Sequence, residues 1–383
     1  MKNYLSILKL EYRRIIFDML SITIIFIGTA FYSFYYPFPY ENDIVRKMPV
    51  AIVDLDKSDL SRTVVTMLNN TESLKVMQYP SMEEAKKGVY SRDVFGIIYI
   101  PDEFYKMVAK GESPTVSVFA DGSYFILYST AITAATQIVL MTAAGVKIQK
   151  MSMLGVPLTD AVLLQSAVNV TAKPVFNPRA GYVGFVAPAI YAIIVQQILL
   201  MVILLVHAAG YEKGYGYPEN SSTFTILCAK MTVYMTIFAA VFSFFFTIGP
   251  MAFGIQLHNS LIEAVIFAIP YGLSIALFGI TLSVFARDRD AVLLVMLMTS
   301  IPFVMLSGFI WPHWMMPDWI KYFSYIIPST PGVTGFLYIR QMGADITDVM
   351  PKYINLWIQV ALYTVTAVLS IKWQQKQKQF ITL

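Results

Sequence analysis

The sequence predicts an α-helical integral membrane protein with six transmembrane helices and an inserted mixed α/β domain outside the cytoplasm. Hydrophobic residues make up 57% of the 383-residue chain and charged residues only 14%, with a mean hydropathy of +0.60. Soluble proteins average about 25% charged residues. Several stretches are long and apolar enough to cross a bilayer. Between the first two of them, short strand-like and helix-like segments alternate, which is typical of an α/β layer.

Six stretches of about 20 apolar residues provide the predicted transmembrane helices, because that length crosses the hydrocarbon core. They are residues 16–34, 183–207, 224–253, 261–285, 291–310 and 353–371. An aromatic segment (FYSFYYPFPY) follows the first stretch, which favours an uncleaved span over a signal peptide. The boundaries are 1–15 for a cytoplasmic or interfacial amphipathic helix, 16–35 for transmembrane helix 1, 36–181 for the inserted domain, 182–372 for transmembrane helices 2–6 and 373–383 for a cytoplasmic tail.

The distribution of Lys and Arg predicts that both termini are cytoplasmic, because cytoplasmic loops are enriched in these residues. Basic residues precede the first span, follow the last, and occupy the ARDRDA turn between spans four and five, which contains Arg287 and Arg289. The GIQLHNS loop between spans three and four has no Lys or Arg, so we place it outside. This orientation requires an even number of crossings.

A seventh apolar stretch, residues 124–146, is the main alternative to this topology. If it crossed the membrane, the ARDRDA turn and the carboxyl tail would face outward. It also contains Ser129, Gln137, four threonines and several alanines, which lower its hydrophobicity for its length. We therefore interpret it as a long helix of the water-exposed domain, packed on one face.

The inserted domain, residues 36–181, has the size of a single domain. Strands are predicted at 49–54, 73–79, 94–100 and 115–121, with a last strand at 169–176. Helices are predicted at 58–70, 81–89 and 101–111. Ser58 is a candidate N-cap, and Ser81 with Glu84 has the spacing of a capping box. Pro101 is expected at the first helical position.

Charge and cysteine content argue against several other classes. The net charge is only +4 and the basic residues are scattered, so we predict no nucleic-acid partner. Cys228 is the only cysteine and lies in an apolar run, typical of a buried thiol. The three histidines lie far apart and no Cys/His pair has zinc spacing, so no metal site is predicted. No phosphate-binding loop of the G-x-x-x-x-G-K-[ST] type occurs.

Several segments, in order along the chain, resemble the type-2 ABC exporter permeases that carry a large domain between spans one and two. They are LKLEYRRIIFD (8–18), PVAIVDLDKSDLSR (49–62), FGIIYIPDEF (95–104), FADGSYFILYS (119–129) and MMPDWIKYFSYIIPSTPGVTGF (315–336). The resemblance covers nearly the whole chain. It implies a transporter subunit without its own ATPase site, in the inner (plasma) membrane. ATP and Mg²⁺ would then be bound by a separate ATPase subunit, and the permease would pair with itself or with a second permease.

The cytoplasmic turn 208–223 is the candidate coupling site for the ATPase. Glu212, Lys213 and Gly214 match the family pattern after span two, and Glu219 adds a charge. Gly216 and Pro218 replace good helix formers, which weakens the expected coupling helix. A solvated turn is the alternative. Arg287 and Arg289 belong to the second cytoplasmic turn.

Glu11, Arg13 and Arg14 lie in an amphipathic segment that we predict as a helix in the headgroup plane. The alternative is the cytoplasmic start of span one. Three charges lie near span ends, Asp18, Lys230 and Glu263, and we interpret Lys230 and Glu263 as anchors that reach the interfaces. No carboxylate lies near a span centre, which argues against a proton-coupled carrier.

Residues 311–352 are too broken to span the membrane and too apolar for a solvated loop, so we predict re-entrant or interfacial half-helices on the outer side. Its aromatic and proline residues are candidates for an outer gate: Trp311, Pro312, Trp314, Trp319, Pro328 and Pro331. The alternative is an aromatic belt that only anchors the bundle.

Apolar walls without a charged pore ring favour a hydrophobic or amphiphilic substrate over an ion. Two other functions stay open: a membrane-anchored receptor or envelope assembly factor that binds a partner through residues 36–181, and a membrane enzyme acting on lipid-linked substrates. The enzyme reading lacks a cluster of His, Asp, Glu or Cys at the spans. A periplasmic adaptor is a further partner class for such a domain.

Overall fold

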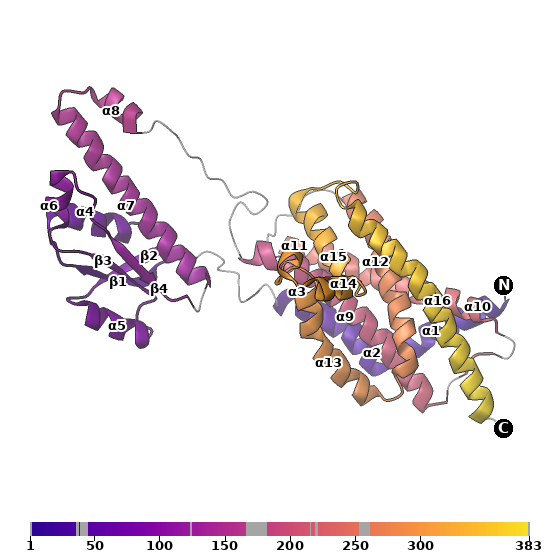
Figure 1. The fold of residues 1–383 in the computed structure, drawn as a ribbon. Helices are drawn as coiled ribbons and strands as arrows, with labels where there is room; N and C mark the ends of the chain where they lie inside the picture. The colour runs from indigo at the N-terminus through magenta and orange to yellow at the C-terminus, as the bar shows by residue number, and fades with distance from the viewer. Residues whose placement is uncertain are drawn as a thin grey trace. The chain divides into compact units, whose positions relative to one another are not determined.

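The computed structural model describes residues 2–35, 38, 45–122, 125–165, 182–214, 216–218, 221–252 and 261–381. The chain divides into two compact units (Figure 1). We call Asn42–Lys173 the sheet unit, and Met1–Glu41 with Pro174–Leu383 the helical unit. The sheet unit lies within the range 36–181 that the sequence assigned to an inserted domain.

The sheet unit contains a four-stranded sheet with the strand order β2-β1-β3-β4. The strands are β1 (Met48–Asp54), β2 (Leu74–Gln78), β3 (Gly96–Ile100) and β4 (Ser117–Ala120). β1 pairs in parallel with β2 and β3, whereas β4 is antiparallel to β3. The central strands β1 and β3 are rich in Val and Ile because helices cover both of their faces. All four strands lie where the sequence predicts them.

Helices cover the two faces of this sheet unequally (Figure 1). α5 (Met82–Tyr90) packs on one face through Ala85, whereas α4 (Asp59–Asn69), α6 (Phe104–Lys110) and α7 (Phe125–Met153) pack on the other. Ser58 caps α4 and Ser81 caps α5, as predicted. The predicted start of α6 at Pro101 is wrong: Glu103 has φ 55, a left-handed conformation that prevents a continuous helix from Pro101. The predicted strand 169–176 lies outside the described residues.

The long helix α7 packs on the sheet through a narrow strip of small residues. Ala131, Ala134, Ala135 and Ile138 are buried in the same core as β1 and β3. Their spacing of three and four residues places them on one helix face. α7 ends before Gly155, which has φ 87, and α8 (Leu158–Gln165) follows. Residues 127–153 are also long and apolar enough to cross a membrane, so its aqueous location stays a prediction.

The helical unit is built around α9 (Tyr182–Glu212). α10 (Thr223–Ser243), α12 (Leu261–Leu282), α13 (Arg289–Leu306) and α15 (Ser329–Phe336) contact it, and α16 (Met350–Ile381) packs on α12. The π-helical turn η3 (Phe244–Ile248) and α11 (Gly249–Ala252) continue α10, and the short 3-10 helix η4 (Ser283–Phe285) ends α12. Helices with the length and hydropathy of membrane spans cover residues 186–212, 223–252, 261–285, 289–306 and 350–376. These five correspond to predicted spans two to six.

The amino-terminal part of the helical unit bends sharply. α1 (Lys2–Ile16) is followed by α2 (Met19–Thr23), the π-helical turn η1 (Ile24–Gly28) and α3 (Thr29–Tyr35). The axes of residues 3–16 and 19–35 differ by 74°. Asp18 lies at the bend, where its carboxylate accepts a hydrogen bond from the Ser21 amide (3.1 Å) and caps α2. A separate helix therefore precedes the first predicted span.

The segment after α13 consists of short pieces, none long enough to span a membrane. They are η5 (His313–Met315), α14 (Asp318–Ser324), α15 and the π-helical turn η6 (Leu337–Gln341). Every residue of α15 is buried. The sequence predicted this broken helical character. Its position relative to a membrane stays a prediction.

Candidate functional site

Both predicted cytoplasmic turns and both chain ends meet in the helical unit. The first turn joins α9 to α10 and the second joins η4 to α13. α1 and the carboxyl-terminal part of α16 contact the same elements. We call this region the turn cluster and define it as residues 208–223, 283–291, α1 with Asp18, and residues 370–376.

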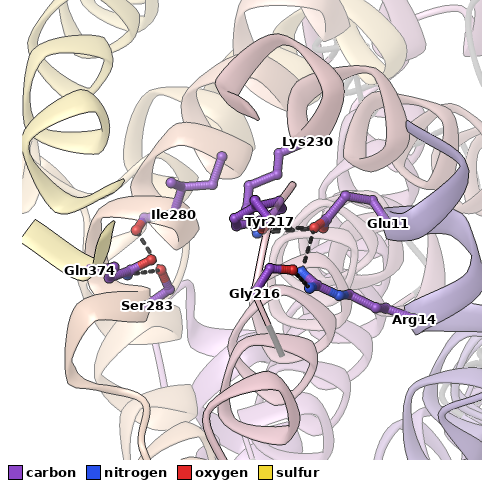
Figure 2. Close-up of polar contacts among 8 residues, drawn as sticks. All are labelled: Glu11, Arg14, Gly216, Tyr217, Lys230, Ile280, Ser283 and Gln374. Atoms are coloured by element: carbon purple, nitrogen blue, oxygen red, sulfur yellow. Dashed lines mark hydrogen bonds and ion pairs between the residues drawn. The ribbon is translucent and has the colours of Figure 1, made fainter. Parts of the chain in front are cut away.

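A buried carboxylate, Glu11 of α1, lies in the turn cluster (Figure 2). Its Oε1 accepts hydrogen bonds from Arg14 Nη1 (2.9 Å) and from the Tyr217 hydroxyl (2.7 Å). Its Oε2 lies 3.4 Å from Lys230 Nζ of α10. Because a buried carboxylate is costly unless it is paired and hydrogen-bonded, these three donors fix α1 against α10 and the first turn.

The predicted role of Lys230 as an interfacial anchor is wrong. Its side chain is buried and pairs with Glu11, 219 positions away in the chain. Glu11 itself does not lie on an exposed polar face of α1: Ile7, Glu11 and Ile15, spaced by four residues, form the buried face. A partner of opposite charge within reach makes burial of Lys230 less costly than it would be alone.

Two tyrosines of α1 reinforce this contact with α10. The hydroxyls of Tyr4 and Tyr12 each lie 2.9 Å from a threonine hydroxyl of α10, those of Thr232 and Thr236. Arg13, the third residue predicted in the interfacial helix, is exposed on the opposite side. α1 is therefore an amphipathic helix, with one face packed on protein. Its location in the headgroup plane stays a prediction.

Tyr217 is a functional candidate that the sequence did not suggest. Its ring lies 4.8 Å from the guanidinium carbon of Arg14 and 5.7 Å from Lys230 Nζ. Arg14 Nη2 also donates to the carbonyl of Gly216 (2.8 Å). Burial, and then the neighbouring Glu11 carboxylate, raise the pKa of Tyr217 well above its usual value. The hydroxyl therefore stays protonated and serves as a neutral donor to Glu11.

A second contact joins the two turns to each other. Glu212 Oε1 accepts a hydrogen bond from the backbone amide of Arg289 (3.1 Å), and the Arg289 guanidinium forms an ion pair with Asp18. The sequence placed these three residues in separate elements. The structure brings them together where α2, α9 and α13 meet. Among the predicted coupling residues, Lys213 and Gly214 end α9, with Gly214 at φ 64, and Glu219 lies outside the described residues.

The end of α16 contacts both turns. Gln375 Nε2 donates to the Ser221 carbonyl (3.1 Å), and its Oε1 accepts from the Thr223 hydroxyl (2.8 Å). Gln374 Nε2 donates to the Ser283 hydroxyl (3.3 Å; Figure 2). The guanidinium carbon of Arg287 lies 5.8 Å from the Trp373 ring centre. One helix end therefore contacts the first turn through Gln375, η4 through Gln374 and the second turn through Trp373.

The described residues between α9 and α10 form no helix: 213–214 are a turn, and 216–218 and 221–222 have no regular secondary structure. This agrees with the prediction that Gly216 and Pro218 weaken a coupling helix. The turn is instead held by side chains of α1 and α16, and the Glu212 side chain before it accepts from the backbone amide of Arg289.

The outer-gate candidates do not share one environment. Trp314 and Trp319 are exposed, Trp311 and Pro312 are partly buried, and Pro328 and Pro331 are buried at α15. The sequence analysis also missed Arg340 in η6. Its side chain is buried, and Nη2 donates to the carbonyl of Phe246 in the π-helical turn η3 (3.4 Å). Pro250, four residues after Phe246, has no backbone N–H to donate to this carbonyl, and Arg340 provides a donor instead.

Residues 13–369 match the family model of the ABC-2 family transporter proteins. The chain belongs to this family. It is 24% identical over 176 residues to the "Probable multidrug ABC transporter permease YbhR" of Escherichia coli K12, covering 45% of this chain and 48% of that protein. It is 19% identical over 326 residues to the "ABC transporter G family member 20" of Dictyostelium discoideum, covering 81% of this chain and 41% of that protein.

The matches span about half the length, or less, of these curated relatives. Together with its apolar helices, the family match makes this chain a transmembrane subunit of an ABC transporter. The resemblance noted in the sequence is thereby confirmed for the family. Both turns and Lys230 lie in the part of the chain that the family model covers, whereas Glu11 and residues 370–376 lie just outside it.

Proposed function

We propose that this chain is the permease subunit of an ABC exporter and moves a hydrophobic or amphiphilic substrate out of the cytoplasm or the inner leaflet. The energy comes from ATP hydrolysed, with Mg²⁺, by a separate ATPase subunit. The family match and the multidrug permease among its relatives support this proposal. The observation that carries it is the turn cluster, because it links the two turns to α2, α9, α10, α13 and α16.

In this proposal, the ATPase contacts the turn 208–223, and the turn cluster transmits the displacement. Glu212 passes movement of α9 to α13 and α2 through Arg289 and Asp18. Glu11, Arg14 and Lys230 pass movement of the turn to α1 and α10. Buried charge pairs suit this role because they hold a defined geometry, and leaving one charge unpaired is strongly unfavourable.

The proposed orientation places the turn cluster and both termini in the cytoplasm, and residues 36–181 in the periplasm or outside the cell. The sheet of the sheet unit supports an aqueous location for α7, since an open sheet edge is not tolerated in lipid. The protein then crosses the inner membrane six times. It acts as a homodimer or with a second permease, and residues 36–181 provide a surface for a periplasmic adaptor.

Cysteine labelling tests this orientation. In a Cys228→Ser background, we expect Met141→Cys on α7 to react with a membrane-impermeant maleimide added outside, and Gln379→Cys to react only after permeabilisation. Met141 is suitable because its side chain is 60% exposed. External reaction of position 379, or protection of position 141 by lipid, would overturn the six-span arrangement.

The coupling role is tested by Glu212→Arg, which replaces the acceptor of the Arg289 amide by a positive charge. We expect substrate efflux in vesicles to fall severalfold, while the ATPase still co-purifies in mild detergent, because the hydrogen bond to the Arg289 amide is lost and a positive charge is placed beside Arg289. Glu83→Arg on the exposed face of α5 is the matched control and retains efflux. Unchanged efflux with Glu212→Arg would refute the coupling assignment.

A further inference from the structure

A pocket of about 390 Å³ lies in the helical unit between the end of α1 and the end of α9. Its positive charges come from Arg13, Arg14 and Lys213. Its apolar wall includes Leu10, Phe17 and Val206. A concave site that combines several cations with an apolar wall suits an anionic amphiphile better than a small ion.

The charges within the pocket are not equivalent. Asp18 also lines it, but the carboxylate is paired with Arg289 and caps α2, so its negative charge is offset. Arg14 directs its two Nη atoms to Glu11 and Gly216 and contributes a positive field. Arg13 is exposed, with its guanidinium carbon 5.4 Å from the Phe17 ring centre. Lys213 is exposed as well. Arg13 and Lys213 are thus the cations that can approach a ligand.

The depth of the pocket matches the headgroup region of a bilayer. Lys213 follows directly after the 27-residue apolar helix 186–212. A helix of this length extends about 40 Å, which is close to the thickness of a bilayer with its headgroups. The end of this helix, and Lys213 with it, is therefore expected at the level of the headgroups. Ile16, Phe17 and Met19 are 59%, 73% and 80% exposed at the bend beside the pocket. These exposed apolar side chains beside the charged pocket offer a surface on which acyl chains could pack.

We propose that this pocket binds the phosphate headgroup of an anionic phospholipid, with Arg13 and Lys213 as its charged ligands and the acyl chains beside Phe17. Basic pockets between transmembrane helices are suited to such headgroups. The lipid would lie against α1 and the first turn, next to the Glu11 network. This inference needs only the membrane-embedded helical unit and does not depend on the coupling role of Glu212.

Native mass spectrometry of the full chain in detergent tests the proposal. We expect phosphatidylglycerol to bind at least tenfold more tightly than phosphatidylcholine with the same acyl chains. Arg13→Gln and Lys213→Gln should each lower the phosphatidylglycerol affinity about fivefold, since each cation near an anionic headgroup contributes about that factor. Phosphatidylcholine binding should not change.

Lys9→Gln is the matched control. Lys9 is exposed one turn before Arg13 on the same helix and does not line the pocket. An equal loss with Lys9→Gln would show general surface attraction and overturn the proposal. So would equal affinity for the two lipids, or displacement of phosphatidylglycerol by inorganic phosphate at 10-fold lower concentration, which would indicate a free-anion site. Because binding is measured directly, failure here leaves the efflux result with Glu212→Arg unaffected.

Discussion

Two regions of the helical unit are held together by opposite means. The turn cluster uses buried charges, with Glu11 receiving three donors. The packing around α15 uses steric fit. An added Cβ at Gly332 would overlap the Tyr271 ring, and one at Gly335 would overlap the Phe267 ring. The Phe336 ring stacks edge-on with Phe267 at 5.0 Å.

The difference matters for how each region responds to change. A charge network fixes which side chains meet, and loss of one member leaves a buried charge without a partner. Close packing of apolar groups, as at α15, involves no charge that a substitution could leave unpaired. It does not tolerate added volume. The turn cluster is therefore suited to transmitting displacement, whereas α15 is suited to holding α9 and α12 at a constant separation.

The largest effect is expected from Lys230→Met. This change leaves Glu11 buried with fewer donors, and breaking a buried pair costs about 3–5 kcal/mol. Thermal unfolding in detergent should show the loss as a lower Tm. The double variant Glu11→Met with Lys230→Met should be more stable than the sum of the two single changes predicts, because the Glu11–Lys230 contact can be lost only once. A strictly additive double variant would show that Glu11 and Lys230 do not interact.

A smaller effect is expected from Gly335→Ala. The new methyl group meets the Phe267 ring, and overpacking of this kind costs about 1–3 kcal/mol. Gly145→Ala is the matched control with the opposite sign: nothing lies within 4 Å of its added Cβ, and Ala is favoured over Gly in a helix by about 1 kcal/mol. If both variants changed the Tm equally, close contact would not be what distinguishes α15.

Elements that depend on residues close together in the sequence could be predicted from it. Spans two to six depend on runs of apolar residues, and the strands depend on short Val- and Ile-rich segments between turns. Ser58 and Ser81 were found because an N-cap bonds a residue only three positions away. The start of α6 was misplaced because the left-handed conformation of Glu103 has no sequence signature.

The contacts of the turn cluster could not be predicted, because they join residues far apart in the chain. Lys230 near a span end fits an interfacial anchor until its partner, 219 positions earlier, is known. One feature of the sequence pointed to the Glu11 contact: Glu11 lies on the same helix face as the apolar residues Ile7 and Ile15. Because a buried carboxylate needs a compensating partner, its position on this face indicates a buried donor nearby. Tyr217 and Arg340 gave no comparable indication.

The end of α16 has a mechanical consequence. Gln375 bonds the first turn, whereas its neighbour Gln374 bonds Ser283 of η4, shortly before the second turn. A displacement of the first turn that carries α16 with it would therefore also pull on η4. A force on the first turn would thus be shared with the segment around η4. A single ATPase bound at the first turn would then displace both regions together.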